Sequence, residues 1–319
     1  MLRFIVPASS RWSARMEGVY RTMASKLFLG IDGGGTKTSF CAVDANGKVV
    51  ARSQSLGTSI DTVSPEETLA RLKEGTLALK QNRYAGVCAC LGGILSQKDK
   101  DGVIAMLKQL PDVGPATLYR AENDAANAFR SVFAKEGIVF IVGTGSVAMG
   151  KGKDGTFLRL GGYGYKEGDL GSGYNLGWEG LRALARYFDG RTTCSLLDKA
   201  LIDDLKITNK EELATVFNTY SRTQIAALAP VLVASRASND AKAILVAGAK
   251  EYASMAMTLT HKLSLQQSSY AVVGGIGSKT AYLDFIQKAV KQTCPHLSFA
   301  MPAMDPEVAA AYLIHEPER

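Results

Sequence analysis

The stretch Leu27-Phe-Leu-Gly-Ile-Asp32-Gly-Gly-Gly-Thr36-Lys-Thr-Ser-Phe-Cys-Ala-Val-Asp44-Ala-Asn-Gly-Lys48 decides the fold expected for this chain. Three glycines follow one apolar run and an Asn-Gly pair follows a second, a pattern typical of strands joined by tight turns. Three consecutive residues without Cβ atoms let backbone N–H groups approach a ligand closely. The stretch therefore predicts either a phosphate-binding turn or an ordinary glycine hairpin.

Polar side chains flank the first turn. Asp32 stands at the end of the predicted strand 27–31, a position that suits a carboxylate facing a hydrated divalent cation. Thr36 and Thr38 add hydroxyl groups, and Lys37 adds one cation. These residue types favour the phosphate-binding interpretation without excluding the hairpin.

The pattern of strand, glycine turn and strand recurs along the chain. Gly143-Thr144-Gly145-Ser146 follows the apolar run 137–142, and Lys153-Asp154-Gly155 repeats the later hairpin turn. A third turn, Gly274-Gly275-Ile276-Gly277-Ser278, follows the apolar run 270–273. The repetition predicts two related domains that each present a glycine turn, although a chance recurrence of hairpins would give the same pattern.

Apolar periodicity in the rest of the chain predicts an α/β protein. Gly161–Gly180 is dense in glycine and predicts a loop that is flexible or holds its backbone close to a ligand. Pro230 predicts a kink, and Ala309, Ala310 and Ala311 predict close packing of a terminal helix. Helices are predicted at 64–81, 101–110, 125–133, 181–188, 210–220, 223–234, 240–263, 281–292 and from 305 onward, and further strands at 86–94 and 117–120.

Composition limits the classes of protein to consider. The 319 residues are 46% hydrophobic and 21% charged, which fits an ordinary globular protein with two cores. No apolar run approaches the roughly 18–20 residues that span a bilayer. The net charge is +7, but the chain contains no run of basic residues. The sequence therefore predicts neither a membrane partner nor a nucleic-acid partner, and it is compatible with the binding of anionic small molecules.

Cysteine and histidine usage narrows the chemistry. The five cysteines are scattered and form no CxxC motif, which predicts neither a zinc site nor a disulfide framework and fits a reducing cytoplasm. His261, His296 and His315 all lie away from the glycine turns. We therefore expect acid–base chemistry to depend on carboxylates.

Residues 1–25 contain several arginines and serines and almost no acidic residue. We expect them to form a disordered extension or to result from an upstream start, because Met23-Ala-Ser-Lys begins just before the first strand. Their composition also resembles a mitochondrial presequence, which is the alternative.

Two common nucleotide-binding motifs do not account for the turns. No GxxxxGK[ST] sequence occurs, so none of the turns is a Walker loop. Gly143–Ala148 matches GxGxx[GA], but a dinucleotide fingerprint requires a helix next, and here a strand and an Asp-Gly turn follow. A Rossmann dehydrogenase is therefore disfavoured.

Five motifs in order carry a family resemblance: Asp32-Gly-Gly-Gly-Thr36, Asn123-Asp-Ala-Ala126, Gly143-Thr-Gly-Ser146, Gly168-Asp-Leu-Gly-Ser172 and Val273-Gly-Gly-Ile-Gly277. Together they resemble the N-acetylglucosamine kinase and glucosamine kinase group of the BadF/BadG/BcrA/BcrD ATPase family, in the actin–hexokinase–Hsp70 superfamily. The resemblance covers residues 26–315 and implies two ribonuclease-H-like domains with a nucleotide- and sugar-binding cleft between them. The first domain would be 26–125, completed by helix 305–315, and the second 126–304.

The resemblance also implies the nucleotide and metal side of the site. Asp32 would hold Mg²⁺ through water, and Asp124 would be the general base for a sugar hydroxyl. From the residues alone, the alternative for Asp124 is a helix N-cap. ATP would contact Gly33, Gly34, Gly35, Thr36 and Lys37 in the first turn, Thr144 and Gly145 in the second, and Gly274, Gly275 and Gly277 in the third.

The sugar side departs from the family pattern. Leu170 stands where the family usually has Glu, Val147 where Asn is common, and Ser59 where another Asn contacts the sugar. The resemblance implies ATP-dependent phosphorylation of an amino sugar at the 6-position, and it leaves N-acetylglucosamine, glucosamine and N-acetylmuramic acid open as the substrate. The implied substrate-binding residues are Ser59, Asp124, Ser146, Gly162, Tyr163, Gly164 and Asp169.

Two other functions compete with the kinase. ATPase activators of 2-hydroxyacyl-CoA dehydratases belong to the same wider family and bridge an iron–sulfur cluster between subunits, whereas Cys88 and Cys90 here resemble buried small residues. A non-catalytic sugar sensor is the third candidate, against which the presence of Asp32 and Asp124 argues. Family members are often dimers, and a homodimer stays open for this chain.

Overall fold

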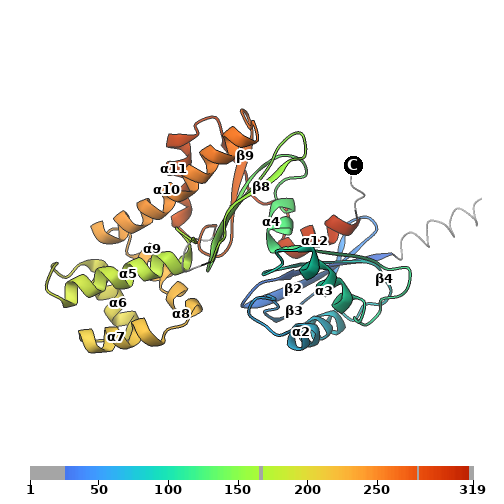
Figure 1. Cartoon of the computed structure of the whole chain (residues 1–319), viewed down its shortest axis with the longest axis horizontal. Helices are drawn as coiled ribbons and strands as arrows, with labels where there is room; N and C mark the ends of the chain where they lie inside the picture. The colour runs from blue at the N-terminus through green and yellow to red at the C-terminus, as the bar shows by residue number, and fades with distance from the viewer. Residues whose placement is uncertain (1–25, 165–167, 279, 316–319) are drawn as a thin grey trace, which may run out of the picture. The chain divides into compact units, whose positions relative to one another are not determined.

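The structure is a computed structural model that describes residues 26–164, 168–278 and 280–315 (Figure 1). Its contacts form two compact units. Unit 1 contains the chain up to Ser131 together with the part from Met304 onward, and unit 2 is Val132–Ala303. The first boundary thus falls after Ser131 rather than after residue 125, because the intervening helix packs on the terminal helix. The expectations for residues 1–25 lie outside the described residues.

Unit 1 is built on a five-stranded sheet in the order β3-β2-β1-β4-β5. The meander expected from the opening stretch is confirmed, because β1 pairs antiparallel with β2 and β2 with β3. Strands β1, β4 and β5 are parallel, so their carboxyl ends meet at one edge of the sheet. The elements are β1 (Leu27–Gly33), β2 (Lys37–Asp44), β3 (Val49–Leu56), α2 (Pro65–Ala78), β4 (Tyr84–Leu91), α3 (Gln97–Leu107), β5 (Leu118–Asn123), α4 (Asp124–Arg130) and α12 (Pro306–His315).

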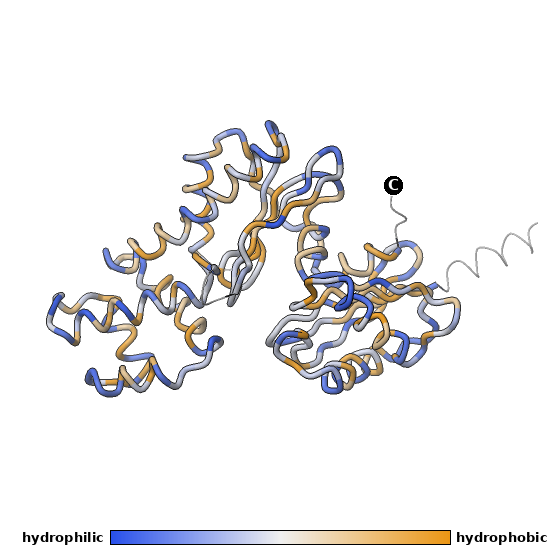
Figure 2. The backbone as a smooth tube through the Cα atoms, viewed as in Figure 1, coloured by the Kyte–Doolittle hydropathy of each residue, from blue (hydrophilic) through white to orange (hydrophobic). Residues whose placement is uncertain are grey.

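The two faces of this sheet carry different side chains. Leu29 and Ile31 belong to the core that α2 and α3 cover, and Figure 2 shows this apolar layer along the strands. The intervening Gly30 and Asp32 face the side of α4 and α12, because strand side chains alternate between faces. The alternation therefore directs the carboxylate of Asp32 away from the larger core.

Small residues let α12 approach the sheet closely. A Cβ atom on Gly30 would collide with the carbonyl oxygen of Glu307 and with Ala311. Ala309, Ala310 and Ala311 are fully buried, which confirms the packing expected from their sequence. Arg52 on β3 forms ion pairs with Glu307 and, at 2.8 Å, with Asp305, which fixes the start of the helix.

Unit 2 contains a second five-stranded sheet in the order β10-β9-β6-β7-β8, with β6, β7 and β8 antiparallel and β9 parallel to β6. The strand pattern of unit 1 thus recurs, as the repeated glycine turns predicted. The elements are β6 (Gly137–Val142), β7 (Ser146–Lys151), β8 (Phe157–Gly161), α5 (Gly173–Phe188), α6 (Leu196–Leu205), α7 (Lys210–Thr219), α8 (Arg222–Ala226), α9 (Ala229–Ala234), α10 (Asn239–Lys262), β9 (Ser269–Val273), α11 (Tyr282–Thr293) and β10 (Ser298–Phe299).

The prediction of a loop over Gly161–Gly180 is wrong from Gly173 onward, where α5 begins. Ser172 caps this helix by accepting a hydrogen bond from the N–H of Asn175. Gly177 and Gly180 lie inside α5 because a side chain at either would collide with the carbonyl of Ile225 or with Leu232. Tertiary packing here overrides the low helix propensity of glycine.

Two further helical predictions need correction. The single helix predicted at 223–234 is two helices, α8 and α9. The break between them comes before Pro230, which occupies the first turn of α9. Helix α6 was not predicted, although the capping box of Ser195 and Asp198 marks its start.

All five cysteines lie among the described residues. Cys41, Cys88, Cys90 and Cys294 are buried, Cys194 is exposed, and all five are free thiols. Among the described helices, none combines the length and apolar character needed to cross a membrane.

Gly30→Ala should lower the free energy of unfolding by about 1–3 kcal/mol, because the added methyl group forces α12 away from β1. The control is Gly102→Ala on the exposed face of α3, where a Cβ atom meets open space and alanine should stabilise the helix by about 0.5–1 kcal/mol. Urea unfolding of both variants measures the difference. Equal stability of the two variants would contradict the close approach of α12.

Candidate active site

The first glycine turn is held against a neighbouring loop of unit 1. The N–H of Thr58 donates to the carbonyl of Gly34 at 3.0 Å, and Thr38 and Thr58 share a hydroxyl hydrogen bond of 2.9 Å. Gly33 has no room for a side chain beside Thr58, whereas Gly35 faces open space. Gly34 is half-buried, and Gly35, Thr36 and Lys37 are exposed. The turn therefore packs on one side and presents its backbone on the other, as a phosphate-binding turn requires.

Asp32 lies at the carboxyl end of β1 in an environment that disfavours its charge. Its Oδ1 accepts a 2.7 Å hydrogen bond from the side-chain amide of Asn127, the fully buried residue one turn along α4 from Asp124. Burial raises the pKa of Asp32 to about 7, and the negative charges of Asp124 and Glu307 add to this rise. The Asn127 hydrogen bond and the Lys37 ammonium oppose it.

Asp124 and Ser59 meet at the same edge of the sheet. Gly33, Leu91 and Asn123 stand in register across β1, β4 and β5, so the residues that follow these strands are neighbours. A Cβ atom on Gly92 would collide with the hydroxyl of Ser59 and lie 3.5 Å from Asp124 Oδ2.

The N-cap role considered for Asp124 belongs instead to its neighbour. Asn123 caps α4, with its Oδ1 accepting from the N–H of Ala125 at 3.0 Å. Asp124 is the first residue of α4, and its carboxylate lies next to Gly92. The structure thus brings Asp32, the first turn, Ser59 and Asp124 together within unit 1.

The second and third turns lie side by side in unit 2. The N–H groups of Ile276 and Gly277 donate to the carbonyl of Val142, directly before Gly143. Gly274 adopts a φ of 96°, and a Cβ atom there would lie 2.5 Å from Val142 O, whereas Gly275 is exposed to open space. At the other side of the second turn, the first N–H groups of α5 donate to the carbonyls of Gly143 and Thr144 at 2.8 and 3.1 Å.

The predicted sugar loop places one buried carboxylate beside the second turn. Asp169 Oδ2 accepts from Arg222 Nη2 at 3.1 Å, and the side chain of Asp169 is only 4% exposed. Burial raises the pKa of Asp169, while the guanidinium of Arg222 opposes the rise. Ser146 donates to the carbonyl of Leu170 at 2.9 Å and so fixes the loop next to Asp169.

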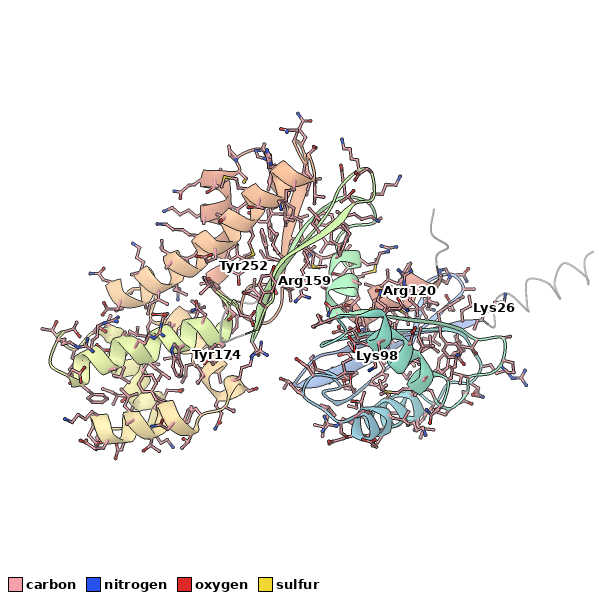
Figure 3. All side chains as sticks on the ribbon, viewed as in Figure 1. Lys26, Lys98, Arg120, Arg159, Tyr174 and Tyr252 are labelled. Atoms are coloured by element: carbon pink, nitrogen blue, oxygen red, sulfur yellow. The ribbon has the colours of Figure 1, made fainter. Side chains whose placement is uncertain are left out.

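The start of the sugar loop follows β8. Arg159, labelled in Figure 3, donates from Nη2 to the carbonyl of Gly162 at 2.5 Å. Gly162 and Gly164 adopt positive φ angles of 70° and 105°, and the ring-bearing side chain of Tyr163 is 79% exposed. Unit 2 therefore brings together Thr144, Gly145, Ser146, Asp169 and the third turn, with Gly162–Gly164 on the adjoining loop.

Two residues at the site were not predicted from the sequence. Asn127 stands three residues after Asp124, so helical spacing places both on one face of α4, and this signal could have identified it. Arg222 is 53 residues from its partner Asp169 and belongs to no motif, so only the fold reveals the pair.

The residues around Asp32 suit a divalent cation bound through water. The negative charges of Asp124 and Glu307 both act on Asp32, and a hydrated cation would neutralise this excess negative charge. Among the described residues no group of three or more His, Cys, Asp or Glu side chains forms a direct metal cage. The carboxylates near Asp32 are of the kind that could hold Mg²⁺ through water, because this ion usually keeps several water ligands.

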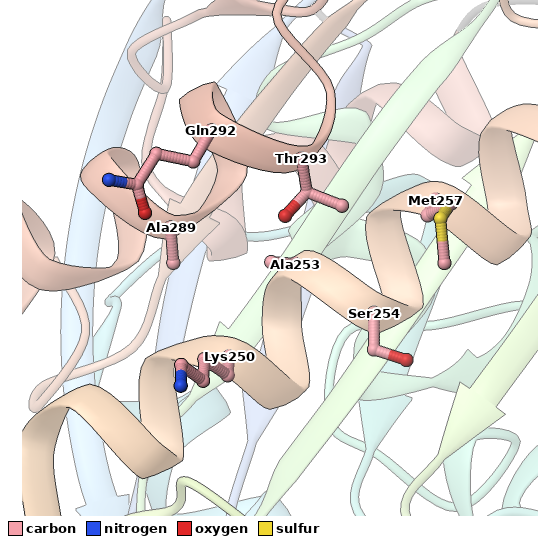
Figure 4. A pocket seen from close by; sticks show the side chains of 7 residues that line it. All are labelled: Lys250, Ala253, Ser254, Met257, Ala289, Gln292 and Thr293. Atoms are coloured by element: carbon pink, nitrogen blue, oxygen red, sulfur yellow. The ribbon is translucent and has the colours of Figure 1, made fainter.

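One surface groove lies away from the predicted residues. A groove of about 280 Å³ between α10 and α11 is lined by Lys250, Met257 and Gln292, among others (Figure 4). None of the residues that line it belongs to a glycine turn or to the sugar loop. Turns at strand ends, rather than a closed cavity within either unit, form the candidate site.

Solved structures share this architecture. A candidate N-acetylglucosamine kinase from Chromobacterium violaceum aligns with a TM-score of 0.75 at 22% identity, covering 91% of this chain and 99% of that one. A ROK family glucokinase from Streptomyces griseus, solved with glucose and AMPPNP, aligns with a TM-score of 0.58 at 15% identity, covering 90% and 99%. The fold is thus the two-domain, ribonuclease-H-like α/β fold of the actin-like sugar kinases.

The sequence defines the family within that fold. The model of the BadF/BadG/BcrA/BcrD ATPase family matches residues 29–313, and the chain belongs to this family. An N-acetyl-D-glucosamine kinase from Dictyostelium discoideum is 30% identical over 315 residues, 91% of this chain and 98% of the relative. An N-acetylmuramic acid/N-acetylglucosamine kinase from Clostridium acetobutylicum is 29% identical over 271 residues, 81% and 88% of the two chains.

Asp32→Asn should stabilise the metal-free protein at pH 8. Between about pH 4 and 7 the unfolded chain loses the Asp32 proton while the native state keeps it, so the free energy of unfolding falls as pH rises through this window. Without the carboxylate the protein keeps this stability, which amounts to at most about 4 kcal/mol at 1.36 kcal/mol per pH unit. Chemical unfolding at pH 4 and pH 8 measures the free energy of unfolding of both proteins.

The control for this prediction is Asp284→Asn, which removes a carboxylate from the first turn of α11. It should leave the pH dependence of stability unchanged. An Asp32→Asn variant with wild-type stability at both pH values would contradict the electrostatic description of Asp32.

Gly274→Ala and Gly275→Ala should separate folding from ligand binding in the third turn. Alanine at Gly274 strains a positive φ angle and collides with Val142, so the melting temperature should fall. Alanine at Gly275 meets open space, so stability should stay at the wild-type value while nucleotide affinity falls. Thermal unfolding and calorimetric nucleotide titration distinguish the two, and unchanged nucleotide affinity in Gly275→Ala would remove that residue from the site.

Proposed function

We propose that the chain is an ATP-dependent kinase that phosphorylates an amino sugar, N-acetylglucosamine or glucosamine, at its 6-hydroxyl group. The observation that carries this proposal is the pairing of Asp32 and Asp124 at one edge of the sheet of unit 1. The carboxylate of Asp32 accepts a hydrogen bond from Asn127, whereas that of Asp124 lies next to Gly92. Carboxylates in different surroundings are typical of separate metal-binding and acid–base roles. The kinase relative from Dictyostelium discoideum supports the sugar class.

Asp124 would act on the sugar hydroxyl. Its carboxylate would accept the hydroxyl proton as the sugar oxygen forms a bond to the γ-phosphorus of ATP and the bond from that phosphorus to the β-phosphate oxygen breaks, releasing ADP. Phosphoryl transfer requires chiefly positioning and charge neutralisation, so one placed carboxylate is sufficient as the base. The cap of α4 is consistent with this role, because Asn123 and not Asp124 is the N-cap residue of the helix.

The glycine turns would position ATP. The open backbone at Gly34 and Gly35, with Thr36 and Lys37, suits the β- and γ-phosphates. We assign Thr144 and Gly145 to ATP as well. Gly274, Gly275 and Gly277 would lie against the adenosine and its α-phosphate. Asp32, held by Asn127, would hold Mg²⁺ through water, and the bound ion would supply neutralisation of the phosphate charge.

We assign the sugar-binding residues from the family resemblance. We assign Ser59 and Asp124 from unit 1 and Ser146, Gly162, Tyr163, Gly164 and Asp169 from unit 2. The buried carboxylate of Asp169 supports this assignment, because hydrogen bonds to such groups give strong discrimination between substrates. The Clostridium acetobutylicum relative acts on N-acetylmuramic acid as well, so we include this sugar in the substrate panel below.

The activator alternative receives little support from the cysteines. Cys88 and Cys90 are fully buried on β4, with their sulfur atoms 4.0 Å apart, and they pack against α12. Thiols in this position are unsuited to bridging a cluster between subunits. We therefore retain the kinase and propose a cytoplasmic enzyme with a small-molecule sugar partner and neither a nucleic-acid nor a membrane partner, and we leave open a homodimer.

Asp124→Asn should lower kcat for the preferred sugar by about 10²–10⁴-fold, because the variant lacks the base but keeps the shape of the residue. Affinity for ATP should stay within about twofold of wild type. The assay couples ADP release to NADH oxidation across N-acetylglucosamine, glucosamine, N-acetylmuramic acid and glucose.

Asp284→Asn serves again as the matched control, since it alters a first-turn carboxylate on α11 that lies outside the proposed site. Near-normal turnover by Asp124→Asn would remove Asp124 as the base. An absence of sugar-dependent ADP release by the wild-type protein across the panel would contradict the kinase itself.

A further inference from the structure

Asp169 is a buried carboxylate with only one of its oxygen atoms engaged by a side chain. Oδ2 accepts from Arg222, while Oδ1 is buried and lies within hydrogen-bond distance of no donor among the described residues, although the backbone N–H groups of Gly164 and Ser146 act on the carboxylate. A buried acceptor without a donor costs free energy, so native proteins seldom leave one without a role. The orphaned oxygen indicates a donor supplied by a ligand.

Arg222 reaches Asp169 because helix α8 is fixed against α5. The capping box of Ser221 and Gln224 sets the start of α8 at Arg222. A side chain at Gly177 would collide with the carbonyl of Ile225, so glycine at this position permits the close contact of the two helices. The guanidinium is therefore held by packed backbone and not by a mobile loop.

The ion pair lies directly against the second glycine turn. A Cβ atom on Gly145 would lie 2.6 Å from Arg222 Nη2 and 2.7 Å from Asp169 Oδ2. Glycine at position 145 thus leaves room for the ion pair. This reason for a glycine does not depend on phosphate binding.

Charge also favours a positioning role for Arg222. A carboxylate that is 4% exposed is costly to ionise unless a cation compensates. Arg222 is the cation in direct contact, and Arg159 on β8 acts on Asp169 without a direct hydrogen bond to it. Arg222 thus stabilises the ionised carboxylate through Oδ2 and leaves Oδ1 available.

We propose that Arg222 positions Asp169: it orients the Asp169 carboxylate and keeps that carboxylate ionised. Oδ1 of Asp169 then accepts a hydrogen bond from a sugar hydroxyl group. This inference rests on the proposed kinase function. Arg222 itself would not touch the sugar, so its contribution is to the affinity and selectivity for the sugar and not to the affinity for ATP.

The test compares Arg222→Met, which removes the charge but keeps an unbranched side chain, with Arg222→Lys, which keeps the charge. Arg222→Met should raise KM for the preferred sugar by about 10–100-fold, the range expected when a charged hydrogen-bond partner is lost. KM for ATP should change less than about twofold, and Arg222→Lys should recover part of the sugar affinity. Arg182→Met is the control, because Arg182 forms a comparable but surface ion pair with Glu179.

A double-variant comparison separates positioning from general stability. In an Asp169→Asn background, Arg222→Met should add little further loss of sugar affinity, because the two residues act through one carboxylate. Sugar binding is also measured by calorimetry without nucleotide, and folding by circular dichroism and melting temperature. If Arg222→Met does not fold, Arg222→Gln replaces it in the same measurements.

The outcomes distinguish this inference from the kinase proposal. Wild-type sugar affinity in the Arg222 variants, equal increases in KM for sugar and for ATP, or additive losses in the double variant would each overturn the positioning role while leaving the kinase intact. A wild-type protein that neither binds nor phosphorylates any sugar in the panel would overturn both.

Discussion

The constraint on which the rest of the structure depends is the absence of side chains where strands end. Gly33 packs against Thr58, and Gly274 and Gly277 pack against Val142, at distances that admit only hydrogen in place of a methyl group. These contacts close the turns from behind and leave Gly35 and Gly275 facing open space. The same strand ends carry Asp32 and lead into Asp124, so the glycines and the carboxylates share one structural origin.

Unfavourable electrostatic interactions are concentrated at this edge of the sheet of unit 1. Asp32 is half-buried near two other carboxylates, and its charge is stabilised by one amide and one ammonium group. Such an arrangement lowers stability near neutral pH, and it is typical of sites where a bound cation or substrate completes the balance of charge. Unit 2 shows the same principle at Asp169, where a guanidinium compensates a buried carboxylate but leaves one oxygen unsatisfied.

The sequence predicted the meander, the repeat and the α/β class because apolar periodicity and Asn-Gly or Gly-Gly turns are local signals. Helix α5 was misjudged at Gly173–Gly180, since the reason for Gly177 lies in the backbone of Ile225, which is distant in sequence. The proposed roles of Asp32 and Asp124 came from a family resemblance, and they stay predictions about chemistry even though both residues lie at one edge of a sheet. The partner of Asp169 could not be predicted, because Arg222 is brought to it by helix packing and not by spacing.

The measurement that tests the central claim most directly is ³¹P and ¹H NMR of the products formed from ATP, Mg²⁺ and N-acetylglucosamine or glucosamine. We predict one new phosphate monoester signal whose phosphorus couples to the two protons on C6, appearing together with ADP. Inorganic phosphate as the sole new phosphorus product besides ADP, or coupling to a different sugar proton, would contradict the proposed kinase or its 6-position, respectively.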